Sequence, residues 1–248
     1  MACCSTNKIV HDHAKKESVW DVFKHELMHH LPYATMSVAL ALMIVSLINV
    51  FFDSGIVACT LPAAHAHVHG AMCNHSHSSG MDVLFHSFHF MHILFATAGT
   101  MVTFYRYSKR FFMGLLIGSV SSMIFCTLSD ILLPYVAGSM LGVQMELHIC
   151  FATELANIVP FLVVGLINGV VMSYSEEYLS EQNSLTLHFW HTFISAMASI
   201  FYAIGHGLPN YYDHLGMFFM LMVVAVIVPC TLSDVVAPIL FARMTDKK

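Results

Sequence analysis

The pentapeptide CTLSD stands at residues 126–130 and returns unchanged at residues 230–234, and a proline follows each aspartate by four residues. Two further pairs of segments recur in the same order: HFMH at 89–92 with HFWH at 188–191, and HLPYAT at 30–35 with HICFAT at 148–153. A single match of this length is compatible with chance in an apolar chain. Three pairs in one order indicate a duplicated unit, which predicts two related halves.

The composition predicts an all-α integral membrane protein. The chain has 57% hydrophobic and 10% charged residues, and its mean hydropathy is +0.71, outside the usual balance of soluble domains. Apolar runs occupy about 31–52, 83–103, 111–138, 147–172, 185–204 and 217–241. Each has the length of about 20 residues that a helix needs to cross a hydrocarbon core of about 30 Å. None shows barrel-type alternation, so we expect six transmembrane helices and no removable signal peptide before the first.

The distribution of basic residues predicts the orientation. All ten Lys and Arg residues lie in the N-terminal tail, in the loop after the second run or in the C-terminal tail. Six spans put these segments on one side, which the positive-inside bias makes the cytoplasmic side of an inner or plasma membrane. The net charge of −5, without another basic patch in the sequence, does not favour nucleic acid as a partner. The lipid bilayer and a metal ion are the partners that we expect.

The repeat and the spans together predict the domain organisation. We expect a cytoplasmic tail at 1–30, a first three-helix repeat at 31–138 with an outer loop at 53–82, a second three-helix repeat at 139–243 and a tail at 244–248. Because three is odd, the halves must cross the membrane in opposite directions. This 3+3 inverted-topology plan is common among secondary transporters. Pores share it, so it does not separate a carrier from a channel, and the sequence does not decide between a monomer and a homo-oligomer.

Histidine and aspartate side chains in the repeated segments predict metal binding. HxxH spacing puts two imidazoles on one helical face, and an aspartate from a neighbouring helix adds an oxygen ligand. Such a set suits a divalent transition metal ion, namely zinc, iron, manganese, nickel or copper. We expect one cluster near each membrane face. The outer cluster comprises His86, His89, His92, Asp130, Glu146 and His148, with Glu154 one turn deeper. The inner cluster comprises His25, Glu26, His29, His30, His188, His191 and Asp234. A thiolate at the cysteine one turn before each aspartate (Cys126, Cys230) shifts the preference toward Zn(II) or Cu(I).

Each of these residues also has a simpler role when it is taken alone. A lone histidine at a membrane interface is usually an amphipathic anchor, and each aspartate can instead help to cap a helix that the following proline interrupts. Ionisable groups inside an apolar span are rare, which favours function for Asp130 and Asp234. Glu154 has no counterpart in the first half, so we interpret it as a candidate proton carrier near the midplane. A hydrogen bond to a neighbouring helix is the alternative for Glu154.

The expected outer loop contains a histidine-rich tract, with His65, His67, His69, His75 and His77 among Ala, Gly and Ser residues. Such a tract has no apolar pattern with which to fold, and its composition is typical of metal-binding segments. We expect it to capture ions at the outer mouth. A neutral low-complexity spacer is the alternative interpretation.

Two different functions remain open on sequence grounds. Residues 25–29 read HELMH, which fits the HExxH pattern of metalloproteases with Glu26 as the general base. In a chain with 18 histidines such a match also arises by accident. Haem ligation by His92 with His148, or by His30 with His191, is a further alternative. The sequence favours a transporter of a divalent transition metal ion over both.

Overall fold

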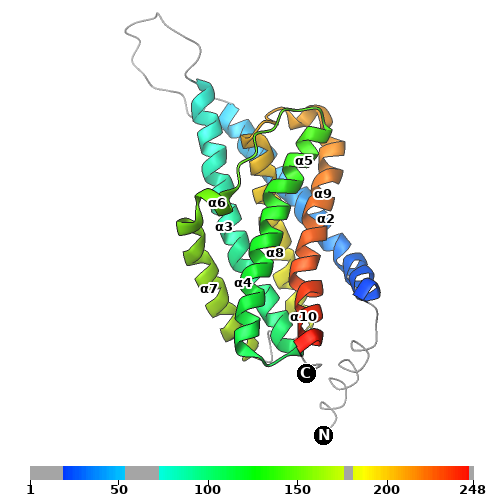
Figure 1. Ribbon diagram of the computed structural model, residues 1–248. Helices are drawn as coiled ribbons and strands as arrows, with labels where there is room; N and C mark the ends of the chain where they lie inside the picture. The colour runs from blue at the N-terminus through cyan, green and yellow to red at the C-terminus, as the bar shows by residue number, and fades with distance from the viewer. Residues whose placement is uncertain (1–18, 54–72, 176–180, 246–248) are drawn as a thin grey trace, which may run out of the picture.

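The computed structural model describes residues 19–53, 73–175 and 181–245. Within these ranges every regular element is helical, and the helices pack into one bundle (Figure 1). In chain order the elements are α2 (Val19–Asp53), α3 (Cys73–Tyr107), α4 (Phe111–Thr127), η1 (Leu128–Leu132), α5 (Leu133–Met140), α6 (Cys150–Thr153), α7 (Leu155–Ser173), α8 (Glu181–Gly205), η2 (Tyr211–His214), α9 (Leu215–Thr231), η3 (Leu232–Val236) and α10 (Ala237–Thr245).

Within the described residues, five helical segments are long and apolar enough to cross a membrane. They are Phe23–Val50, Phe111–Met140, Leu155–Ser173, Thr186–Gly205 and Tyr211–Thr245. These segments indicate a multi-pass membrane protein, the class predicted from composition. The 35-residue helix α3 is not among them, because histidine, serine and threonine interrupt its apolar run. It is about 50 Å long at 1.5 Å per residue, and it runs alongside α4, α7 and α8 (Figure 1).

Two neighbouring helices approach α3 closely through glycines. On α7, a Cβ atom added at Gly165 would lie 2.7 Å from the backbone oxygen of Leu94, and one added at Gly169 would also meet α3 at less than 3 Å. On α4, Gly114 and Gly118 have the same spacing and make room for side chains of α3: a Cβ added at either would lie 2.6 Å from Tyr105 or Met101. Small residues at this spacing allow helix backbones to pack tightly where lipid supplies no hydrophobic drive. The packing holds α3, with its histidines, in the interior.

The two CTLSD segments share a backbone irregularity. In each, the α-helix gives way to a π turn, η1 at Leu128–Leu132 and η3 at Leu232–Val236. The amide that follows each turn bonds to a carbonyl five residues earlier. The proline four residues after each aspartate lacks the N–H that an α-helix would direct at the aspartate carbonyl, which accounts for the break. π turns occur frequently at functional sites, and each of these carries a buried aspartate.

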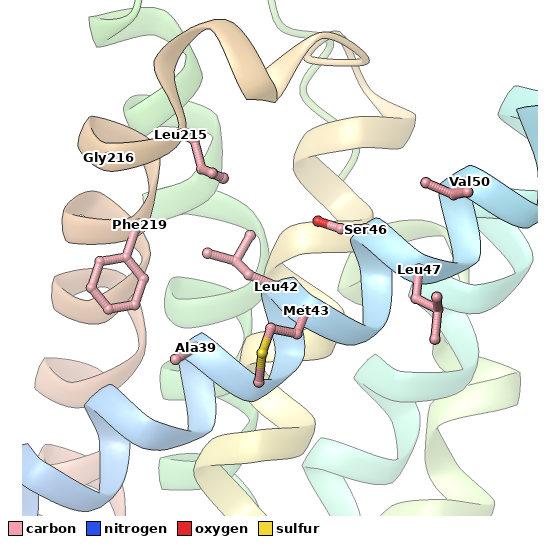
Figure 2. Close-up of a pocket in the computed structure, with 9 residues that line it drawn as sticks. All are labelled: Ala39, Leu42, Met43, Ser46, Leu47, Val50, Leu215, Gly216 and Phe219. Atoms are coloured by element: carbon pink, nitrogen blue, oxygen red, sulfur yellow. The ribbon is translucent and has the colours of Figure 1, made fainter.

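α2 crosses the bundle obliquely and leaves an apolar groove against α9 (Figures 1 and 2). The groove has a volume of about 590 Å³, and Ser46 is the one polar side chain among the nine that line it. The Ser46 hydroxyl is itself hydrogen-bonded to the Tyr211 hydroxyl at 2.9 Å. The groove offers no group that binds a metal or a proton, so the candidate site lies elsewhere.

Two helix boundaries differ from those expected. α3 begins at Cys73, so part of the loop expected at 53–82 is helical, and residues 54–72 lie outside the described ranges. The apolar run at 147–172 is not one helix, because residues 143–149 are irregular and a break at Glu154 separates the single turn of α6 from α7. Hydropathy measures where a chain is apolar, whereas backbone hydrogen bonding and capping decide where a helix begins and ends.

Candidate metal centre

Two imidazoles from different halves of the sequence meet inside the bundle. His92 on α3 and His191 on α8 are each 1% exposed, and their Nε2 atoms are 2.6 Å apart. The two residues hold the same place in the repeated segments HFMH and HFWH, 99 positions apart. The contact therefore joins matching positions of the two halves.

A buried aspartate orients each of these rings from the opposite nitrogen. Nδ1 of His92 donates to Oδ2 of Asp130 at 2.7 Å, and Nδ1 of His191 donates to Oδ2 of Asp234. A carboxylate at Nδ1 fixes the tautomer and the ring orientation, so that the lone pair of Nε2 is left for a cation. This is the arrangement that metal-binding histidines generally have.

The facing nitrogens need a positive charge between them. Because both Nδ1 atoms donate to carboxylates, two neutral rings would bring two Nε2 lone pairs together at 2.6 Å. A shared proton or a metal ion removes that repulsion. Two nitrogens bound to one tetrahedral Zn(II) stand about 3.3 Å apart, so ring movements of less than about 1 Å convert the hydrogen-bonded pair into a metal-binding pair.

A cysteine completes the group of ligand atoms. Sγ of Cys230 lies 3.9 Å from Nε2 of His92, and the ligand atoms of His92, His191 and Cys230 all lie within 4.8 Å of one another. All three side chains are buried. Two imidazole nitrogens and one sulfur are a donor set that suits Zn(II) and copper ions.

Two more histidines precede His92 on α3, at positions 89 and 86. His89 is fully buried, and its Nδ1 donates to Asp130 at 2.8 Å. One turn earlier, His86 faces His148, with ring centroids 5.7 Å apart. The ligand atoms of His86, His148 and Cys150 lie within 4.8 Å of one another. The Nε2 atoms of His86 and His89 are buried and have no hydrogen-bond partner among the described residues.

Two titratable groups at this end lie outside the apolar helices. Burial, with the carboxylates of Asp82 and Glu154 nearby, raises the pKa of Cys150 to about 12. Burial also lowers the pKa of His206 below its ordinary value. At neutral pH, and without a bound cation, the thiol is therefore protonated and the His206 ring is neutral.

A similar series of contacts leads away from His191, through Asp234 and His188 to His30 and Glu26. Nδ1 of His188 lies 3.5 Å from Oδ2 of Asp234, and the His188 ring is 4.0 Å from the ring of His30. Nε2 of His30 lies 3.2 Å from Oε2 of Glu26. A cavity of about 30 Å³ is lined in part by His30, His188 and Asp234, which is enough for a water molecule. Nε2 of His188 and Nδ1 of His30 are buried without a partner among the described residues.

The structure differs from the expectation of two separate clusters. The ligands expected near the two membrane faces form one connected group, because Nε2 of His92 contacts Nε2 of His191. The physical reason is the length of α3. Its apolar run begins near residue 83, but the helix begins ten residues earlier, at Cys73, so His89 and His92 lie near the middle of the helix.

The other predicted residues lie at the edges of this group or outside the described ranges. His25 and His29, the histidines of the HExxH match, are both exposed. Glu26 is paired with His30, and the ligand atoms of Glu26, His29 and His30 lie within 4.8 Å of one another. Glu154 directly precedes α7 and does not lie at the middle of that helix. Its carboxylate accepts a hydrogen bond from the side chain of Asn157. Of the loop histidines, His65, His67 and His69 lie outside the described ranges, and His75 and His77 belong to the first turns of α3.

Several residues of the site were not predicted. Cys150 joins His86 and His148 although its counterpart in the repeated segment of the first half is Pro32, which is no metal ligand. Ser195 donates to Oδ1 of Asp130 at 2.9 Å, and Ser199 donates to the Ser129 backbone oxygen at 3.0 Å. The seven-residue interval from His188 to Ser195 puts that serine on the histidine face of α8, a helical periodicity that could have found it.

No family model matches the chain, and comparison with curated proteins and with solved structures found no match either.

Proposed function

We propose that the protein is a membrane transporter that binds a divalent transition metal ion and translocates it through the bundle. The observation that carries the proposal is the pair of facing Nε2 atoms of His92 and His191, each held by a buried aspartate at the other ring nitrogen. Ionisable groups inside an apolar helical bundle are costly to bury, and they commonly mark an ion pathway.

Buried imidazole nitrogens that have no hydrogen-bond partner among the described residues lie on both sides of this pair, and they support translocation as well as binding. His86 and His89 lie on one side, and His188 and His30 lie on the other. A buried polar atom without a partner costs about 1–3 kcal/mol, so four of them in one series require an explanation. An ion that passes from one to the next supplies the missing partner in turn. The group of His92, His191 and Cys230 is then the central binding site along that path.

The proposal includes six spans arranged as an inverted repeat, with both termini in the cytoplasm. α3 would be the sixth span, since it is long enough and lies beside the others (Figure 1). Support comes from interactions that recur with the two halves exchanged. Ser199 on α8 donates to the backbone oxygen of Ser129 at 3.0 Å, and Thr100 on α3, 99 positions earlier, donates to that of Ser233 at 3.1 Å.

The donor set narrows the class of cargo. Two imidazoles and a cysteine sulfur favour Zn(II) and copper ions over Mn(II), which prefers oxygen ligands. The aspartates act here as hydrogen-bond acceptors for the histidines and not as the primary ligands. We therefore place zinc and copper ahead of iron, nickel and manganese as cargo.

The alternative functions receive less support. A metalloprotease site needs both HExxH histidines on one ion, whereas Glu26 and His29 group with His30, and the exposed His25 is not part of that group. Haem would have to fit between two histidines. His92 pairs instead with His191 at 2.6 Å, which leaves no room for a porphyrin, and His30 faces His188.

Ion flux into proteoliposomes tests the proposal. Zn(II) uptake by the wild-type protein should exceed that of empty liposomes, and His92→Gln and His191→Gln should each lower the rate at least tenfold, because each removes one nitrogen ligand. The matched control is His214→Ala, which changes an exposed histidine and should leave the rate unchanged. Gel filtration establishes that each variant is folded.

Two results would contradict transport. One is background flux of Zn(II) and Cu ions in the folded wild-type protein, and the other is unaltered flux in both glutamine variants. Loss of a hydrolytic activity in Glu26→Gln, with flux at background throughout, would instead support the metalloenzyme.

A further inference from the structure

A second group of metal-binding side chains lies beside α3 one turn before His89, at a different point from the His92–His191 pair. His86 comes from α3, Cys150 begins α6, and His148 lies in the irregular segment just before α6. Their ligand atoms lie within 4.8 Å of one another, and Cys150 is fully buried. Three side chains from two distant parts of the chain therefore offer two nitrogens and a sulfur to one point.

The tautomer of His86 leaves its inner nitrogen free to bind a cation. Nδ1 of His86 donates to the backbone oxygen of Asp82 at 2.8 Å, since a carbonyl can only accept. The Asp82 carboxylate lies 3.5 Å from the same nitrogen. Nε2 then carries the lone pair, and it is buried without a partner among the described residues. A backbone carbonyl or carboxylate behind the ring is what metal-binding histidines generally have.

The segment that carries His148 is fixed against the end of α8. The backbone N–H of His148 donates to the Tyr202 hydroxyl at 3.1 Å, and that hydroxyl donates to the Glu146 backbone oxygen at 3.1 Å. The segment passes so close to Gly207 that a Cβ there would lie 2.7 Å from a backbone oxygen, and Gly207 has a φ of +144°, which favours glycine. His148 is thus held in place before any ion binds.

A groove leads to this group from the surface. It has a volume of about 500 Å³, and its polar lining includes Asp82, His86, Glu154 and Asn157. Carboxylates along an approach raise the local concentration of cations. His86 is the one of the three ligands that lines the groove, so the group has ligands, a supporting shell and an access path through His86, as a metal site requires.

We infer that His86, His148 and Cys150 form a second transition metal site, which holds a thiolate-binding ion such as Zn(II) at the mouth of the path. On binding, the thiol of Cys150 releases its proton to water in the groove and its sulfur bonds to the ion. The role of this site as the first binding site along a transport path rests on the proposed function, whereas its ability to bind an ion does not.

Co(II) titration of the purified full-length protein tests the site, because a thiolate bound to Co(II) gives a near-ultraviolet charge-transfer band. The protein used should keep Cys150 alone, with the other six cysteines changed by Cys3→Ser, Cys4→Ser, Cys59→Ser, Cys73→Ser, Cys126→Ser and Cys230→Ser. We expect a band that saturates at one Co(II) per chain. Adding His86→Ala or His148→Ala should weaken Co(II) binding at least tenfold, whereas the control His214→Ala should leave it unchanged.

Absence of the band in folded Cys150-only protein would overturn the inference, and so would a band that survives both histidine substitutions. Where the six-fold variant does not fold, bound Zn(II) is compared between the wild type and Cys150→Ser. One fewer tightly bound ion is expected, and an equal number would overturn the inference. Zn(II) flux in the absence of the Co(II) charge-transfer band would reject this second site but not transport. The band in the absence of flux would reject transport but not this site.

Discussion

The two CTLSD segments are identical in sequence, but their aspartates have different surroundings. Asp130 is fully buried. Its Oδ2 accepts from His89 and His92, and its Oδ1 accepts from Ser129 at 2.8 Å and from Ser195 at 2.9 Å. Asp234 is bonded at Oδ2 only. Its Oδ1 has no partner among the described residues, and its carboxylate borders the small cavity beside His30.

One residue on the facing helix accounts for much of this difference. Ser195 on α8 donates to Asp130, and the residue 99 positions earlier on α3 is Ala96, which has no hydroxyl to offer Asp234. The related pair Ser199 and Thr100 keeps its hydroxyl in both halves. Asp130 therefore receives a hydrogen bond from the other half, whereas the printed partners of Asp234 among the described residues, His188 and His191, belong to its own half.

The two halves therefore share the same π turn, but they differ in how many hydrogen bonds reach the carboxylate of its aspartate. A fully bonded carboxylate is fixed in position, which suits a group that only orients histidines. A carboxylate with a free oxygen beside a cavity can exchange partners. The second half is thus the side on which an ion or a water molecule can reach the aspartate.

The largest effect is expected from deleting the two carboxylates. Asp130→Ala removes an acceptor from four donors and should lower the free energy of unfolding by about 3–5 kcal/mol. Asp234→Ala should lower the free energy of unfolding by about 1–3 kcal/mol, since one of the two carboxylate oxygens of Asp234 already has no hydrogen-bond partner among the described residues. Denaturant titration in detergent micelles, followed by circular dichroism, measures both, with exposed Asp213→Ala as the control. Equal losses would show that the two aspartates are equivalent.

An intermediate effect is expected from making the first half resemble the second. Ser195→Ala takes one donor from Oδ1 of Asp130, and a hydrogen bond to a charged group contributes about 1.5–3 kcal/mol. The same titration should detect this loss. Ser119→Ala serves as the control, because the Ser119 hydroxyl bonds only to the carbonyl of its own helix. A loss no larger than that of the control would refute a specific role for Ser195.

The smallest effect is expected from the reverse change, Ala96→Ser, which offers a hydroxyl to Oδ1 of Asp234. We expect a gain of about 0.5–1.5 kcal/mol in the free energy of unfolding, the usual net worth of one hydrogen bond. Ala98→Ser is the matched control, since it adds a hydroxyl at another buried position of α3 and should destabilise. If both serines destabilise equally, Ala96 does not face the free oxygen.

Local pattern was sufficient to predict the membrane class and the partners within each half. Long apolar runs require helices in lipid, whatever their order in space. The sequence assigns His92 to the same cluster as Asp130, and His191 to the same cluster as Asp234, and in the structure each of these histidines is hydrogen-bonded to that aspartate. These pairs could be predicted because the repeat marks them twice and helical spacing puts the HxxH rings on one face.

The contacts between the halves could not be predicted in this way. The meeting of His92 with His191, the hydroxyl that Ser195 gives to Asp130 and the approach of Cys150 to His86 all depend on how α3 lies against α8 and α6. That placement follows from close packing at glycines and from the true length of α3, neither of which hydropathy encodes.

The sequence by itself therefore determined an all-helical, multi-pass class of protein and the histidine and aspartate chemistry of each half, because composition and short-range periodicity act within a single helix. Only the tertiary structure decided that histidines of the two halves meet, and that Asp234, unlike Asp130, has one oxygen without a partner among the described residues. The reason is physical: a side chain's hydrogen-bond partners are set by the helix packed against it, and identical segments meet different neighbours.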